Sequence, residues 1–497
     1  MLPPLDLLLR SAFSRLRPRV QGLSWLAGCV VSVCALVALW LLFWRVTLPA
    51  ELVWVLALRL RVALLERQNK EQILAMRTRC TPAERKESLA RVLSAISAIH
   101  HDDAHSSPSL DRFLSGWHFG TPISEIDTTC LQRFLCSIMF YVASLDELRR
   151  EERQELDAAV AMVEAARITA GSRNDAMPDN ARASMRVCMP AEPLNWLHFP
   201  LLVYTSLAAI RLSGRAAFAL AGFTRYALGE VTYYRRPATN AGGDAASRLP
   251  LVLLPGVGVG VGGYFPLLVT SLSQEGSELL VVELSQVTAG RMQGRVPAEA
   301  DVAASVLAML AAHSHRQARF ICHSYGTFVL AWLLGQPTGR SVVHSLLLID
   351  PVALLIAFPH TTHGAVYRRL LEPPLTESSS SVVVGSQSRL AAALGSAELL
   401  RRLGVTLYFM REAHIALVLQ RHVHWPSYSL WLQDIPARRR VTVALSTRDA
   451  IVPTREVASY VASRPGLGVK VLWLQAHEHG AVVYHAAQWG ELAQALQ

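Results

Sequence analysis

The spacing of apolar residues divides the chain into two parts with different periodicity. Residues 50–77 and 131–168 carry apolar side chains at helical spacing between Arg and Glu residues, with a break near Ser144 in the second stretch. Thr81 opens a further helical pattern, in the place of an N-cap residue. The pattern therefore predicts a mainly helical region over 45–235.

The second part alternates short runs of leucine and β-branched residues with helical patterns. Nearly continuous apolar strands separated by helices are typical of a parallel sheet that is covered on both faces. The runs lie at 251–256, 279–284, 318–324, 344–350, 440–446 and 468–474. We expect an α/β domain over 250–497, preceded by a small, polar, Gly/Ala-rich linker at 236–249.

The strand and helix alternation is interrupted between Pro351 and Arg440. This stretch contains a Ser-rich segment at 376–388 and apolar helical pieces at 414–432. An insertion at the end of a strand is where a lid is found, so a lid is expected over about 356–438.

Residues 21–44 form a run of 24 residues without a charge. A helix of that length reaches ~36 Å and crosses a hydrocarbon core of about 30 Å. The run follows a basic segment at 1–20 and closes on Trp40, Phe43 and Trp44, as in an interfacial aromatic belt. A cleaved signal peptide has a shorter apolar region, so we expect an uncleaved transmembrane anchor. The organelle and the orientation stay open.

Residues 193–210 form a second uncharged stretch, which Pro200 interrupts. A second membrane span is one interpretation. A helix that lies on the membrane or is buried in the protein is the favoured one, because the stretch is short.

The composition indicates which kinds of partner and cofactor are expected. Hydrophobic residues make up 52% of the chain and charged residues 17%, which favours membrane association. The net charge is +10, but the basic residues form no nucleic-acid-binding module, so no nucleic-acid partner is expected. None of the 7 cysteines forms a CxxC pair, and the His and Asp residues at 100–105 diverge from one another, so we expect no metal and no cofactor.

The candidate nucleophile is Ser324, in the segment Cys-His-Ser-Tyr-Gly between a predicted strand and a predicted helix. A serine on such a turn has an exposed Oγ above the helix N-terminus, whose dipole favours negative charge. The crowded turn requires small residues two positions before and after the serine. Gly326 meets this requirement, whereas Cys322 stands where glycine is usual. A purely structural serine is the alternative interpretation.

The partners of a serine nucleophile follow at later strand ends. Asp449 comes directly after one predicted strand, and His479 after the next. A neutral imidazole must take the serine proton, and a carboxylate must orient that imidazole. Asp350, at the end of the preceding strand, is the alternative acid, and His477 is the alternative base.

A glycine-rich loop at 253–266 follows the first strand of the α/β domain. Its backbone allows close approach to a substrate, so the N–H of Val257 or of Gly258, with that of Tyr325, is expected to form an oxyanion hole. The loop also fits a dinucleotide-binding pattern. Pro266 interrupts the helix that this pattern requires, so the dinucleotide interpretation is not favoured.

Residues 250–495 resemble the α/β-hydrolase fold. The similarity is carried by the segments 255–258, 322–326, 449–453 and 479–480. The segments 115–126 and 192–204 look like those that precede the hydrolase domain in membrane-anchored, uncharacterised α/β hydrolases of fungi, algae and protists. Pro255 and Cys322 depart from the common hydrolase pattern.

The resemblance and the residues together imply a membrane-anchored serine hydrolase that cleaves a lipid-like acyl ester through Ser324, His479 and Asp449. Membrane lipids and a small acyl-ester or lipid substrate are the expected partners, and the oligomeric state stays open. An acyltransferase on the same fold and an inactive membrane scaffold are the alternatives.

Overall fold

The structure is a computed structural model of the chain. It describes residues 45, 47–68, 77–99, 109–170, 192–239, 249–270, 272, 276–291, 295–367 and 410–495. The predicted basic segment and anchor at 1–44, the His/Asp cluster at 100–105 and the Ser-rich part of the predicted lid lie outside the described residues.

The chain divides into two compact units, Met1–Arg61 with Pro200–Val203, and Val62–Phe199 with Tyr204–Gln497. In the first unit, residues 47–61 are helical, and Glu51 accepts a hydrogen bond of 2.8 Å from the N–H of Leu201. No helix within the described ranges is both long and apolar enough to span a bilayer.

The second unit is built around a twisted sheet. Within the described ranges its eight strands lie in the order β1-β2-β4-β3-β5-β6-β7-β8. Strands β3 to β8 pair in parallel, and β2 pairs antiparallel with both β1 and β4. The strands are β1 Thr224–Leu228, β2 Val231–Arg236, β3 Leu251–Leu254, β4 Leu279–Glu283, β5 Ala318–His323, β6 Val343–Ile349, β7 Arg440–Ser446 and β8 Lys470–Leu474.

The predicted α/β architecture and all six predicted apolar strands are confirmed, but the sheet begins earlier than expected. β1 and β2 form a hairpin inside the region predicted to be helical up to residue 235. Arg225, Arg235 and Arg236 interrupt its apolar pattern, and β1 is largely exposed because it lies at the sheet edge. Edge strands are commonly short and charged, so they lack the continuous apolar run that revealed the central strands.

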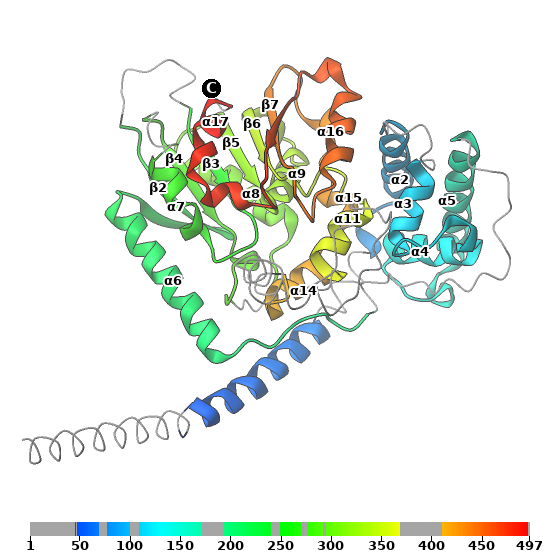
Figure 1. The fold of residues 1–497 in the computed structure, drawn as a ribbon, viewed down its shortest axis with the longest axis horizontal. Coiled ribbons are helices and arrows are strands. Elements are labelled where there is room, and N and C mark those ends of the chain that lie inside the picture. Colours follow the sequence, from blue (N-terminus) through cyan, green and yellow to red (C-terminus); the bar gives the residue numbers. More distant parts are fainter. Residues whose placement is uncertain are drawn as a thin grey trace, which may run out of the picture. The chain divides into compact units, whose positions relative to one another are not determined.

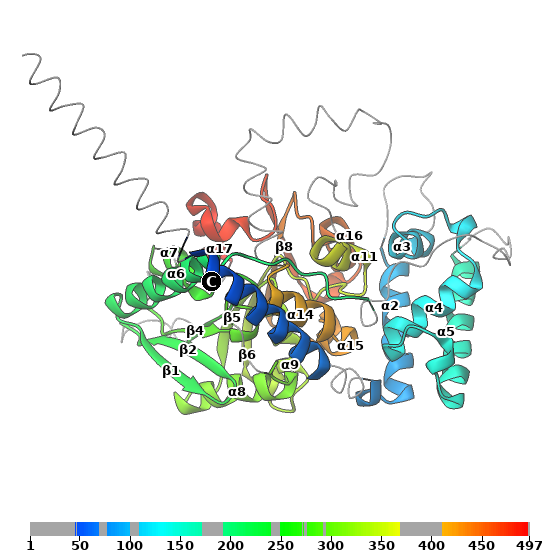
Figure 2. The same ribbon diagram turned by 90° about the horizontal axis from the view of Figure 1, so that it is seen from below.

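Helices cover both faces of the sheet (Figures 1 and 2). Alternate strand residues divide the core in two, as a period of two residues requires. Val252, Phe320 and Leu346 belong to one cluster with residues of α8 and α9. Leu251, Ile321 and Leu347 belong to a second cluster with residues of α7 and α17. The helices are α7 Phe265–Thr270, α8 Glu299–Ala312, α9 Gly326–Leu334, α10 Gly339–Val342, α16 Thr454–Ala462 and α17 Trp489–Gln494.

The N-terminal helices pack on one another and on the described parts of the predicted lid. They are α2 Pro82–Ser97, α3 Ser109–Trp117, α4 Thr128–Phe140 and α5 Arg150–Thr169. Thr81 caps α2 in a capping box with Glu84, as expected. The indole N–H of Trp117 donates to the carbonyl of Ala357 over 3.0 Å, which joins this bundle to the segment after β6.

The described parts of the predicted lid are short helical pieces. They are α11 Pro359–Thr362, the π-helical turn His363–Tyr367, α14 Ala413–Arg421 and α15 Trp425–Tyr428. The remaining long helix, α6 Leu201–Leu220, begins directly after Pro200. Residues 193–200 of the predicted second span therefore have no regular secondary structure.

Candidate active site

Ser324 occupies a sharp turn between β5 and α9. Its φ of +50° is in the left-handed region, which non-glycine residues seldom adopt. The N–H of Ser324 donates to the carbonyl of Ile349 over 2.9 Å. A Cβ on Gly326 would lie 2.1 Å from the carbonyl oxygen of Leu254, so glycine is required there. The crowding expected at this turn from the sequence is thus present.

Cys322 causes no distortion of the turn. It is the penultimate residue of β5 and pairs with Leu254 on one side and Leu348 on the other. Its side chain is fully buried in the apolar core, and this burial raises the pKa of the thiol. Cys322 therefore acts as a small core residue beneath the turn and is protected from thiolate chemistry.

Ser324, His479 and Asp449 form one chain of hydrogen bonds. The Oγ of Ser324 lies 2.7 Å from the Nε2 of His479, and the Nδ1 of His479 lies 2.7 Å from the Oδ2 of Asp449. Because the ionised carboxylate accepts, the Nδ1–H of His479 donates to it. This tautomer leaves Nε2 free to accept the serine proton.

The surroundings favour a basic imidazole. Burial disfavours the charged form of His479, but the Asp449 carboxylate, and after it Asp350, outweigh this cost and raise the pKa of His479. The other oxygen of Asp449 accepts from the N–H groups of Ile451 and Val452 at 2.7 and 2.8 Å. These two bonds fix the carboxylate in the position that orients the ring.

Asp350, the alternative acid, holds the loop that carries His479. Its Oδ2 accepts from the N–H of Gly480 over 2.7 Å and from the Oγ of Ser446 over 2.8 Å. Its Oδ1 accepts from the N–H of Ser446 over 2.9 Å. Burial, followed by the negative charge of Asp449, raises the pKa of Asp350. The geometry therefore gives the ring-orienting position to Asp449.

His477, the alternative base, points elsewhere. Its Nδ1 lies 2.8 Å from the carbonyl oxygen of Gln475, and its ring packs against that of His485 at 4.9 Å between centroids. Of the two histidines in this loop, the structure brings only His479 to Ser324.

Backbone hydrogen bonds distinguish Gly258 from Val257 and Tyr325, the other two expected oxyanion donors. The N–H of Gly258 donates to the carbonyl of Val287 over 3.1 Å, so Gly258 is wrong as an oxyanion donor in this conformation. Gly258 accepts in turn from the N–H of Ala289 over 2.7 Å. These two bonds fix the loop beside Val257. Among the described residues, the N–H groups of Val257 and Tyr325 have no backbone acceptor.

Tyr264 and His323 connect the glycine-rich loop to the nucleophile turn, and neither residue was predicted from the sequence to belong to the site. The Tyr264 hydroxyl accepts from the N–H of Gly256 over 2.8 Å and lies 2.5 Å from the Nδ1 of His323. Burial, with a smaller effect of the His479 charge, lowers the pKa of His323 to about 3. His323 is therefore neutral, and its Nδ1 accepts a hydrogen bond from the Tyr264 hydroxyl. The histidine next to Ser324 was the available signal.

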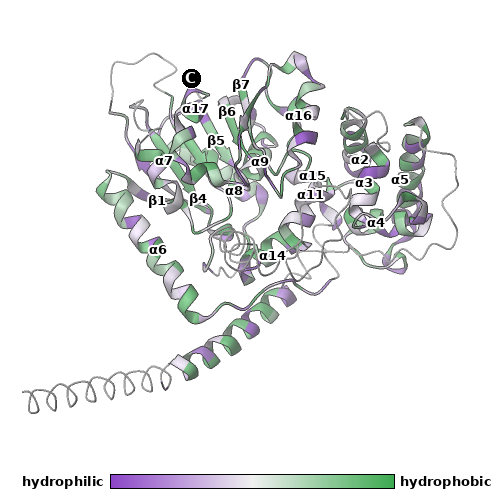
Figure 3. Ribbon diagram, viewed as in Figure 1, coloured by the Kyte–Doolittle hydropathy of each residue, from purple (hydrophilic) through white to green (hydrophobic). Residues whose placement is uncertain are grey.

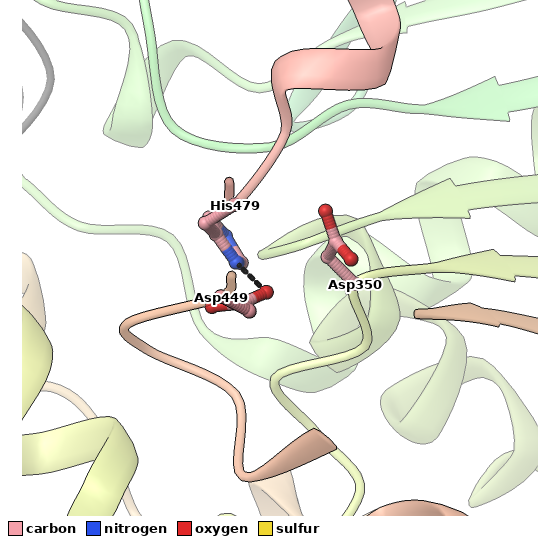
Figure 4. A group of neighbouring side chains, drawn as sticks. All are labelled: Asp350, Asp449 and His479. Carbon is pink, nitrogen blue, oxygen red and sulfur yellow. Dashed lines mark hydrogen bonds and ion pairs between the residues drawn. The ribbon is translucent and has the colours of Figure 1, made fainter. Parts of the chain in front are cut away.

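Asp350, Asp449 and His479 also form a group of potential metal ligands, with one donor atom of each lying within 4.8 Å of the others (Figure 4). The oxygens of both carboxylates already accept hydrogen bonds from N–H or O–H groups. The Nδ1 of His479 donates to Asp449. A cation between these groups would displace those protons, so the donor set fits a hydrogen-bonded acid–histidine pair better than a metal site.

No known protein-family profile matches the chain, and no curated protein matches its sequence. Among solved structures, a membrane phospholipase A described as a bacterial virulence factor is similar, at 17% identity and a TM-score of 0.37, over 60% of this chain and 92% of the other. Naproxen esterase from Bacillus subtilis aligns at 13% identity and a TM-score of 0.36, over 58% and 95% of the chains.

An alpha/beta superfamily hydrolase from Oenococcus oeni aligns at 13% identity and a TM-score of 0.34, over 55% and 99% of the chains. The fold itself follows from the strand order, in which only β2 runs against the parallel strands beside it, and from the turn that places Ser324 between β5 and α9. On these features the chain has the α/β-hydrolase fold.

Proposed function

We propose that this protein is a serine hydrolase that cleaves an acyl ester. The observation that carries the proposal is the hydrogen-bonded chain from Ser324 Oγ through His479 to Asp449, with 2.7 Å at each step. The same geometry activates serine as a nucleophile on unrelated folds.

In the proposed reaction, the Oγ of Ser324 attacks the carbonyl carbon of the ester while its proton passes to the Nε2 of His479. The N–H groups of Val257 and Tyr325 stabilise the oxyanion. When the tetrahedral intermediate collapses, the C–O bond to the alcohol breaks and His479 returns the proton to the leaving alkoxide. Water then attacks the acyl-enzyme by the same steps in reverse, which releases the acid and restores Ser324.

A lipid-like acyl group is the proposed substrate class. An apolar cavity of about 80 Å³ lies between the N-terminal helices and the described lid segments. Phe113, Trp117, Ile356, Val423 and Trp425 are among its lining residues. Its walls suit an alkyl chain, although neither Ser324 nor His479 lines it.

The location at a membrane is part of the proposal. The uncharged run at 21–44 is long enough to cross a bilayer, and it precedes the helix at 47–68. Extraction of cell membranes at alkaline pH tests this anchor. The protein is expected to stay in the pellet, and its release into the supernatant would contradict a membrane span.

Hydrolysis of p-nitrophenyl esters with acyl chains of increasing length tests the activity. We expect turnover by the purified full chain that increases with chain length and is abolished by Ser324→Ala. Ser341→Ala, at an exposed serine outside the site, is the matched control and should keep full activity. Adding glycerol to the assay distinguishes an acyltransferase, which would form a new ester in place of free acid. A folded protein with no turnover would support an inactive scaffold.

A further inference from the structure

Helix α6 has an unusual distribution of charge for a surface helix. Its buried residues are Tyr204 and Leu207 near the start of the helix and Phe218 near its end, and they pack on the α/β domain. Both of its charged residues, Arg211 and Arg215, lie at half-buried positions. The guanidinium of Arg211 donates to the carbonyl of Ala289 over 2.6 Å.

The opposite face of α6 is exposed and uncharged. Ile210, Leu212 and Leu220 are 48%, 62% and 90% exposed. The other exposed residues of the turns after Val203 are small or weakly polar, namely Thr205, Ser206, Ala209, Ser213, Ala216 and Ala219. A helix on a water-facing surface normally places charged residues outward and apolar residues inward. Hydrophobic residues are prominent along α6 in Figure 3.

The exposed face of α6 requires an apolar environment, and the segment 21–68 indicates that this environment is a membrane. The helix at 47–68, taken by itself, has an exposed stripe at Leu48, Leu52, Leu56, Leu60 and Leu64. Its exposed charged residues are Arg59 and Arg67, whereas Glu51 accepts a hydrogen bond from the N–H of Leu201 and Glu66 lies 3.8 Å from Arg421. Before this helix lie 44 residues outside the described structure, of which 21–44 carry no charge.

The only charged residues of α6 are arginines, and an apolar helix face accompanied by arginines is complementary to a bilayer surface that contains anionic phospholipid. A protein partner would instead require a polar rim around an apolar centre, which the small residues of α6 do not provide. We propose that the exposed face of α6 lies in the headgroup region of a phospholipid bilayer.

This docking would act next to the proposed oxyanion hole. Arg211 donates a hydrogen bond to the carbonyl of Ala289. The N–H of Ala289 donates in turn to the carbonyl of Gly258, the residue after Val257. A Cβ on Gly214 of α6 would lie 3.2 Å from the Cα of Gly262, so the helix and the glycine-rich loop are closely packed. A helix held by lipid on its outer face would thus support the glycine-rich loop on its inner face.

Site-specific photocrosslinking tests the docking. The full chain is reconstituted in vesicles of phosphatidylcholine and phosphatidylserine, with photoreactive p-benzoylphenylalanine replacing Ile210, Leu212 or Leu220 in turn. The control carries the same group at Ile168, an exposed apolar residue of α5. We expect phospholipid adducts, detected by mass spectrometry, at the three α6 positions and none at Ile168.

Three outcomes would overturn the proposal: no adduct on α6, lipid adducts of equal yield at Ile168, or crosslinks from α6 to a second copy of the chain. The measurement does not depend on catalysis, so the Ser324→Ala protein should give the same adducts. The absence of hydrolase activity would therefore not affect the docking result. The absence of lipid adducts would likewise not affect the proposed hydrolase activity.

Discussion

The carboxylate of Asp350 lies 2.7 Å from the N–H of Gly480, the residue that follows His479. Asp350 thus holds the histidine loop in place, while Asp449 holds the histidine ring. Two buried carboxylates that follow neighbouring strands therefore position one imidazole, one through the backbone of its loop and the other through its ring.

This division predicts different effects of removing each charge. Asp449→Asn should lower kcat/KM by roughly 10³–10⁴, because it removes the acceptor that fixes the tautomer and stabilises the imidazolium. Asp350→Asn should lower kcat/KM by about tenfold or less, because an asparagine oxygen can still accept from Gly480 and asparagine tolerates the φ of +44° at this position. Steady-state kinetics of both variants, with thermal unfolding as a control for folding, distinguishes the two roles. Equal losses of kcat/KM in the two variants would contradict these separate roles.

The raised pKa of His479 predicts the pH dependence of the reaction. Only the neutral imidazole accepts the serine proton, so kcat/KM should increase as the pH rises through the pKa of His479 in the free enzyme. That pKa lies above the ordinary value of 6.5. Asp449→Asn removes the main group that raises it, so the acidic limb of the residual activity should move to lower pH. An unchanged limb would show that another group is titrating.

The contact between Tyr264 and His323 predicts a positioning effect. Tyr264→Phe keeps the ring but leaves the N–H of Gly256 without its acceptor next to the proposed oxyanion hole. We expect kcat to fall about tenfold, with KM nearly unchanged, because a lost hydrogen bond to a buried group costs about 1–3 kcal/mol. Tyr226→Phe, on the strand β1 at the far edge of the sheet from Ser324, is the control. A fall in thermal stability with unaltered kcat would reduce Tyr264 to a purely structural role.

Burial of Cys322 predicts that it is dispensable for catalysis. Cys322→Ala should leave kcat within about twofold and lower the free energy of unfolding by about 1 kcal/mol, since a small buried group is lost. In the folded wild-type protein, peptide mapping after iodoacetamide treatment should find Cys322 unmodified, because its thiol pKa is raised. Rapid alkylation, or a large loss of activity in the alanine variant, would show that the thiol takes part.

The sequence predicted the central strands and brought the correct serine, aspartate and histidine together for one physical reason. Parallel strands end at the same edge of a sheet, so Ser324, Asp449 and His479 had to lie near one another once β5, β7 and β8 were recognised. The turn that carries Ser324 was also predictable, because its crowding requires glycine at position 326.

Other features depend on contacts that no local pattern contains. Both Asp350 and Asp449 end apolar strands, and only the loop geometry decides which of them reaches the ring. Tyr264 and His323 are 59 residues apart, so their contact follows from how the glycine-rich loop folds back over the turn. The β1–β2 hairpin was missed because its arginines and the exposed edge position of β1 hide the pattern of a strand.

The central claim is that Ser324 is an activated nucleophile. A fluorophosphonate probe forms a bond from its phosphorus to an activated serine Oγ and releases fluoride, so it reports activation without knowledge of the substrate. In the folded full-length protein, peptide mapping should place a single adduct on Ser324, and labelling should disappear in Ser324→Ala and fall steeply in Asp449→Asn. A folded wild-type protein that is never labelled, or labelling that survives Ser324→Ala, would contradict the account.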